Sequence, residues 1–99
     1  MKERWIYRKA LQYWGTEIQI VMAIEEMAEL TKELTKFLRG KQNRLNICEE
    51  IADVEIMISQ IKEAFDKGEV KNLKERKLER LKRMIEENPT AKDVVEGWE

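Results

Sequence analysis

Five carboxylate side chains fall into two clusters whose spacing suits the binding of a cation. The first cluster is Glu25, Glu26 and Glu29, and the second is Glu50 and Asp53. Residues three or four apart on a helix share a face, with side chains about 5–6 Å apart. Like charges held this close repel one another and resist burial unless a cation lies between them. The sequence therefore predicts a metal site built by two antiparallel helices.

The donor atoms on offer indicate which metal the site would take. The chain has no histidine and one cysteine, so its ligands are mainly carboxylate oxygens. Such hard donors suit Mg²⁺ or Mn²⁺, whereas zinc and copper sites use nitrogen and sulfur. The lack of histidine also excludes Ser/His/Asp and Cys/His catalytic groups and the Glu-x-x-His pairs of di-iron bundles. We expect Mg²⁺ as the cofactor, with Mn²⁺ as a substitute.

Four amphipathic helices are expected to position these groups. Apolar residues recur at helical intervals over residues 3–14, 17–38, 46–67 and 70–87. Thr16 and Asn46 are the expected N-caps of the second and third helices, and Gly40 ends the second. Thr90 is expected to cap one last turn. Because the loops are short, we predict an all-α, four-helix antiparallel bundle-like subunit.

Length and composition bound the class of protein. A chain of 99 residues is expected to form one domain, residues 1–99, and to complete its small core by oligomerising. A net charge of −1 gives no long-range attraction to a nucleic acid polymer or an anionic membrane. The single cysteine, the lack of an early apolar run and the lack of a span of about 18–20 apolar residues favour a cytoplasmic protein.

The position of each acidic residue around its helix separates a metal site from an ordinary solvated face. Glu50 falls within the apolar stripe of the third helix and Asp53 flanks it, which a solvated face does not explain. The first cluster lies with Glu33 on the polar face of the second helix. One turn earlier, however, that face carries Ile18 and Met22, as expected of a surface that another helix covers. Both clusters together favour the metal.

The fourth predicted helix supplies positive charge. Lys74 and Lys77 fall within its apolar arc, and Arg80 lies further around the helix. One interpretation is that the lysine stems cover apolar surface while their ammonium groups reach water. The other is that these three residues bind phosphate oxygens that the metal brings in.

The two acidic clusters and their apolar surroundings resemble the MazG-like nucleotide pyrophosphohydrolases. The signature of that family is E-E-x-x-E followed at some distance by E-x-x-D. Here it reads Glu25-Glu26-Met27-Ala28-Glu29 and, twenty residues later, Glu50-Ile51-Ala52-Asp53. The resemblance covers about residues 19–83. It implies an all-α, magnesium-dependent enzyme that assembles as a homodimer or homotetramer.

The resemblance also implies a role for individual residues. The metal ligands would be Glu26, Glu29, Glu50 and Asp53. Either Glu25 or Glu26 would accept the proton of the attacking water, with Glu25 also holding a second ion or orienting water. Gln19 and the aromatic residues of the first helix are candidates for contacting the base. Lys74, Lys77 and Arg80 would steady the phosphates, although Leu81 stands where the family often has asparagine.

The implied reaction is hydrolysis of a nucleoside triphosphate, deoxy or non-standard, to the monophosphate and pyrophosphate. Cleaning of the nucleotide pool is a role that would follow from it. Two alternatives stay open at this point. One is a non-enzymatic helical interaction module whose acidic residues are merely solvated. The other is a catalytically inactive nucleotide-binding sensor, which the departure at Leu81 leaves open.

Overall fold

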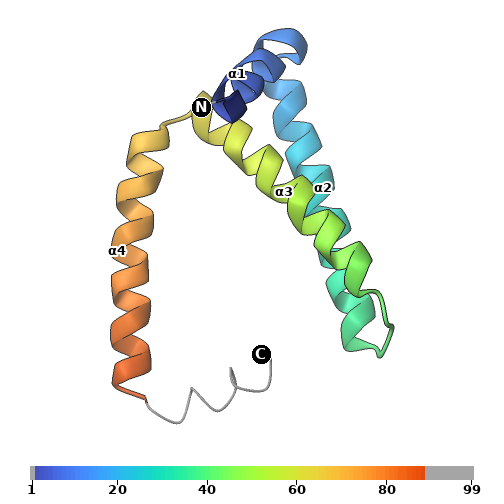
Figure 1. Ribbon diagram of the computed structural model, residues 1–99, viewed down its shortest axis with the longest axis vertical. Coiled ribbons are helices and arrows are strands. Elements are labelled where there is room, and N and C mark those ends of the chain that lie inside the picture. The colour runs from blue at the N-terminus through green and yellow to red at the C-terminus, as the bar shows by residue number, and fades with distance from the viewer. Residues whose placement is uncertain (1, 89–99) are drawn as a thin grey trace. The chain divides into compact units, whose positions relative to one another are not determined.

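The computed structural model describes residues 2–88, which form four helices and no strand (Figure 1). The helices are α1 (Lys2–Trp14), α2 (Thr16–Leu38), α3 (Arg44–Ala64) and α4 (Lys67–Glu86). The predicted all-α class is confirmed for this part of the chain. Within it, no helix combines the length with the apolarity needed to cross a bilayer.

The chain divides into two compact units, Met1–Asp66 and Lys67–Glu99. In the first unit, α2 and α3 lie side by side and α1 contacts both of them (Figure 1). The second unit contains α4. The four-helix bundle and the single domain over residues 1–99 therefore stay predictions.

Two glycines set the ends of α2. Gly15 is its N-cap and has a φ of 93°, a positive value that residues other than glycine rarely adopt. The predicted cap, Thr16, is instead the first residue of the helix. At the other end, the amides of Gly40 and Lys41 donate to the carbonyls of Phe37 and Lys36, at 2.9 and 3.1 Å. This Schellman arrangement needs the φ of 94° that Gly40 supplies.

The ends of α3 differ from the prediction. Asn43, and not Asn46, is the N-cap, and its side chain makes no capping bond because it contacts α2 instead. The helix ends at Ala64, three residues before the predicted end, and α4 begins at Lys67 instead of residue 70. The last turn predicted from Thr90 lies outside the described residues.

The seam between α2 and α3 is unusually polar. Its buried residues are Gln19, Ala23, Glu33, Met57 and Gln60. On α2 these residues recur at intervals of four, three, four and three if the half-buried Glu26 and Leu30 are included. That spacing is the one by which a helix faces a partner helix. Three of the five buried side chains are polar, so hydrogen bonds hold this seam as much as apolar packing does.

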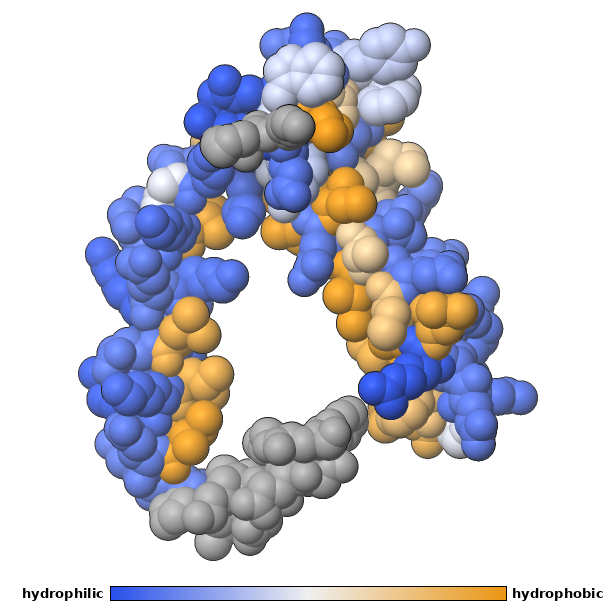
Figure 2. Space-filling model, viewed as in Figure 1, coloured by the Kyte–Doolittle hydropathy of each residue, from blue (hydrophilic) through white to orange (hydrophobic). Residues whose placement is uncertain are grey.

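The apolar stripes predicted for these two helices are largely exposed in this unit. Apart from Phe37, which lies at the rotational position of the seam, their exposed members are Ile24, Met27, Leu34, Leu38, Ile51, Ile58 and Phe65. On each helix the stripe lies next to the seam in the same rotational direction. Because the helices run antiparallel, both stripes lie on one side of the pair, and Figure 2 shows apolar side chains gathered along this unit. We call these seven residues the apolar face.

Candidate metal centre

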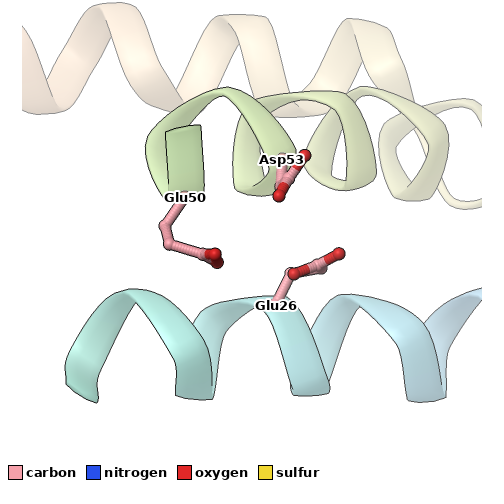
Figure 3. A group of neighbouring side chains, drawn as sticks. All are labelled: Glu26, Glu50 and Asp53. Atoms are coloured by element: carbon pink, nitrogen blue, oxygen red, sulfur yellow. The ribbon is translucent and has the colours of Figure 1, made fainter. Parts of the chain in front are cut away.

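Three of the predicted ligands meet across the seam. Glu26 projects from α2, and Glu50 and Asp53 project toward it from successive turns of α3 (Figure 3). One carboxylate oxygen from each residue lies within 4.8 Å of the others, and all three residues are half-buried. The spacing of three between Glu50 and Asp53 places both on the face of α3 that meets α2.

The electrostatics of this cluster disfavour its ionised form. Burial raises the pKa of the Glu26 carboxyl, and the charges of Asp53, Glu29 and Glu25 raise it further. Burial likewise raises the pKa of Glu50, with a further contribution from the charge of Glu26. A bound proton or cation would stabilise the cluster, because either one reduces the repulsion between the carboxylates.

One oxygen of the cluster lacks a partner. Glu50 Oε2 is buried and accepts no hydrogen bond from the residues that the structure describes. A buried carboxylate oxygen without a donor is costly, so such an atom is suited to a proton, a water molecule or a cation. The remaining donors are carboxylate oxygens too, which is the chemistry that Mg²⁺ and Mn²⁺ prefer. The residues present therefore fit a divalent cation.

The other members of the first cluster lie outside this group. Glu29 and Glu25 are exposed, and neither supplies an oxygen to the three-carboxylate group. The charges of both raise the pKa of Glu26, and that of Glu29 also raises the pKa of Glu50. The structure thus brings together three of the four predicted ligands and leaves Glu29 at the rim.

Two of the predicted base-contacting residues, Gln19 and Trp14, share a hollow, whereas Trp5 and Tyr13 of α1 line a different one. Gln19 lines an open apolar hollow of about 330 Å³ with Trp14, Ile18, Met22 and Met57. Met22 precedes Glu26 by one helical turn, so the hollow adjoins the carboxylates along α2. The Gln19 amide donates to Gln60 Oε1, and the Gln60 amide donates to Met57 Sδ at 3.8 Å. These bonds fix the Gln19 side chain at the edge of the hollow.

The predicted phosphate-binding residues lie on α4. Lys74 and Lys77 share a hollow with the apolar side chains of that helix, and Arg80 lies outside this hollow. The expected position of Lys74 and Lys77 within the apolar arc of the helix is confirmed. Because α4 belongs to the second unit, their role toward the carboxylate cluster stays a prediction.

Sequence reasoning missed two residues of this region, Glu33 and Asn43. Glu33 was expected on a polar face, yet it is only 8% exposed. The Asn43 amide donates to Glu33 Oε1 at 2.7 Å, and the Lys36 ammonium lies 3.4 Å from Glu33 Oε2. The seam spacing from Gln19 through Glu26 to Glu33, seven residues at each step, is the signal that places Glu33 between the helices.

Fold and site together define an all-helical protein with a three-carboxylate cluster at a polar helix seam. Comparisons with protein-family models, curated proteins and solved structures give no match. Function is therefore inferred from the residues and their geometry.

Proposed function

We propose that this protein is a Mg²⁺-dependent nucleoside triphosphate pyrophosphohydrolase similar to the MazG-like enzymes. It would convert a nucleoside triphosphate into the monophosphate and pyrophosphate. The observation that supports this most directly is the cluster of Glu26, Glu50 and Asp53, in which one buried oxygen has no partner. A cluster of carboxylates is one means by which a phosphate-cleaving enzyme holds its cation.

The three clustered carboxylates would hold Mg²⁺, or Mn²⁺ in its place. When bound, the cation neutralises phosphate charge and lowers the pKa of a coordinated water. Glu29, at the rim, is near enough for its charge to act on both Glu26 and Glu50. It would complete the ligand set or hold a second ion.

A carboxylate of the first cluster would accept the proton of the attacking water. Glu26 suits this role because it lies within the cluster that would hold the cation and its water. Glu25 is the alternative, since it is exposed and lies next to Glu26 in the chain. The two assignments predict different effects of Glu25→Gln and Glu26→Gln on kcat and on the Mg²⁺ requirement.

The hollow beside the cluster would hold the nucleobase. Trp14 offers an aromatic face for stacking, and Gln19 offers a hydrogen-bonding amide. Gln19 precedes Glu26 by seven residues, which is about 10.5 Å along a helix. That separation suits a nucleotide whose base lies in the hollow and whose phosphates reach the carboxylates. Lys74, Lys77 and Arg80 would bind phosphate oxygens.

A second copy of the chain is the proposed cover of the apolar face. Ile24 and Leu34 on α2, with Ile51 and Ile58 on α3, expose side chains that a soluble monomer would bury. Two such faces packed together would bury these side chains in a four-helix arrangement. We propose a homodimer or homotetramer, which a sizing column would show as a species larger than 11.9 kDa.

The test is an incubation of the purified protein with Mg²⁺ and a panel of normal and modified ribo- and deoxynucleoside triphosphates. Pyrophosphate and monophosphate are quantified, with Glu50→Gln as the control for contaminating activity. Release that needs the metal and is absent from the variant would support the proposal. Equal release by both proteins, or none with any substrate, would contradict it.

A helical interaction module is the second candidate, because the exposed apolar face also suits another protein partner. Thermal melting with and without millimolar Mg²⁺ separates the two. A real site stabilises the protein by about 2.7 kcal/mol when the metal is at a hundred times its Kd. The interaction module predicts no shift. Tight nucleotide binding without pyrophosphate release would instead indicate a sensor.

A further inference from the structure

The Asn43 side chain, at the end of the loop between α2 and α3, forms hydrogen bonds with Glu33 of α2. The Asn43 amide nitrogen donates to the backbone carbonyl of Glu33 at 2.9 Å and to its carboxylate Oε1 at 2.7 Å. Lys36 lies 3.4 Å from the other carboxylate oxygen. We call the pair of bonds between Asn43 and Glu33 the latch.

The latch acts on the residue from which α3 starts. Asn43 is the N-cap of α3, and its carbonyl accepts the first hydrogen bond of that helix, from Ile47 at 3.0 Å. Glu50 follows Asn43 by seven residues, or about two helical turns. Holding Asn43 against α2 therefore fixes both the rotation and the axial position of the turn that carries Glu50.

Packing alone does not explain a glutamate at this position. Glu33 is buried close enough to the carboxylate cluster for its charge to raise the pKa of Glu50. A neutral side chain would remove that repulsion and would cost less to bury. The carboxylate does offer a strong acceptor for Asn43, since hydrogen bonds to charged groups are shorter and stronger than neutral ones.

We propose that Glu33 and Asn43 are positioning residues of the metal centre, and that the latch aligns Glu50 and Asp53 with Glu26. This inference rests on the proposed function, because it concerns the same cation. Residues that orient metal ligands from outside the coordination shell typically change metal affinity about 10- to 100-fold when they are replaced.

The test measures Mn²⁺ affinity by the loss of the free-ion electron paramagnetic resonance signal, at a temperature where circular dichroism shows every variant folded. Asn43→Ala removes both latch bonds. Asn43→Asp removes the donor but keeps the size of the side chain and its suitability as an N-cap, so it serves if the alanine variant does not fold. Glu33→Gln keeps an oxygen acceptor for Asn43 but removes the charge.

We expect both Asn43 variants to bind Mn²⁺ about 10- to 100-fold more weakly and Glu33→Gln to stay within about 3-fold of the wild type. The double variant Glu33→Gln/Asn43→Asp reverses donor and acceptor, so it should recover part of the affinity that Asn43→Asp loses. A purely structural role would lower the melting temperature without this rescue.

The matched control breaks a polar contact at the other end of the same unit. Arg4 and Arg8 of α1 each lie 3.3 Å from the carboxylate of Glu63 on α3. Arg4→Ala/Arg8→Ala should lower the melting temperature and leave Mn²⁺ affinity unchanged, and a loss as large as that of Asn43→Ala would overturn the inference.

Two further results separate the inference from the proposed function. If the wild type binds Mn²⁺, Glu50→Gln does not, and Asn43→Ala binds as the wild type does, the latch has no positioning role although the metal centre stands. If the wild type binds no Mn²⁺, the metal centre itself is wrong and the latch inference fails with it.

Discussion

Glu50 lies opposite Glu26 across the seam, and the charge of Glu26 raises the pKa of the Glu50 carboxyl above its ordinary value of 4.5. Burial raises the pKa of both groups. The folded protein without metal therefore binds protons more tightly at these two sites than the unfolded chain does. The contribution of these two groups to the free energy of unfolding falls as the pH rises from about 4.5 through the raised pKa values.

Glu50→Gln should raise the melting temperature of the metal-free protein at pH 7, because it removes one of the repelling charges. The gain should shrink toward pH 4, where the wild-type carboxyls are protonated. Thermal melts in a chelator across this pH range measure the difference. Glu49→Gln is the matched control, since Glu49 is exposed and lies outside the cluster. Equal gains for the two variants would exclude special strain at Glu50.

Glu33 contributes in the opposite direction and in a different pH range. The hydrogen bond from Asn43 lowers the pKa of its carboxyl below 4.5, and Lys36 adds to this. Its stabilising contribution is therefore complete above the ordinary value and is lost as the pH falls through the lowered one. The two effects do not overlap, so a melt series above pH 4.5 reports mainly on Glu26 and Glu50.

Replacing each acid of the first cluster should distinguish the general base from the ligands. Loss of a base lowers kcat by about 10²- to 10⁴-fold, and extra Mg²⁺ does not restore it. Loss of a ligand raises the Mg²⁺ concentration needed for half-maximal rate. We expect the first pattern for Glu25→Gln if Glu25 is the base, and both patterns together for Glu26→Gln if Glu26 serves both roles.

Glu29→Gln completes this series as the rim residue. It should raise the Mg²⁺ requirement less than Glu50→Gln does, because Glu29 supplies no oxygen to the three-carboxylate group. A larger effect at Glu29 than at Glu50 would contradict the geometry of the site.

Trp14→Ala should raise KM for the nucleotide about 10-fold and leave kcat nearly unchanged, because it removes a stacking surface distant from the reacting phosphate. Steady-state kinetics with the best substrate of the panel measures this. Trp5→Ala is the control, since Trp5 is an exposed aromatic of the same helix that does not line the hollow. A fall in kcat alone would argue against a base site in the hollow.

Ile58→Asp should convert the proposed oligomer into a monomer, because it places a charge in the apolar face. Ile56→Asp provides a matched control: both isoleucines are exposed on α3, but Ile56 lies about 200° around the helix from Ile58. Light scattering after a sizing column gives the masses. If Ile58→Asp keeps the wild-type mass, the apolar face is not the subunit interface.

The helices and the carboxylate cluster followed from the sequence because both depend on periodicity. Apolar spacing located all four helices to within a few residues, and the position of Glu50 within an apolar stripe singled it out. Local signals at the helix ends misled because several residues compete for each cap. Thr16 and Asn46 are good N-caps in isolation, yet Gly15 and Asn43 occupy the N-cap positions. Gly15 does so through its positive φ, and Asn43 through its contact with α2.

The role of Glu33 was hidden for a different reason. A glutamate on a polar stripe is usually solvated, and only the pairing of α2 with α3 shows that this stripe is the seam itself. Exposed members of the apolar stripes of α2 and α3 form the apolar face. An amphipathic pattern specifies that a face will be covered, but it does not distinguish a neighbouring helix from another chain.

The carboxylate cluster lies in the α2–α3 seam, and the apolar face lies to one side of it. Met22 and Glu29 lie on one side of it and Met27 and Leu34 on the other, with few positions shared between them. Substitutions at Met27 or Leu34 would therefore alter the surface that meets a partner and leave the three clustered carboxylates in place.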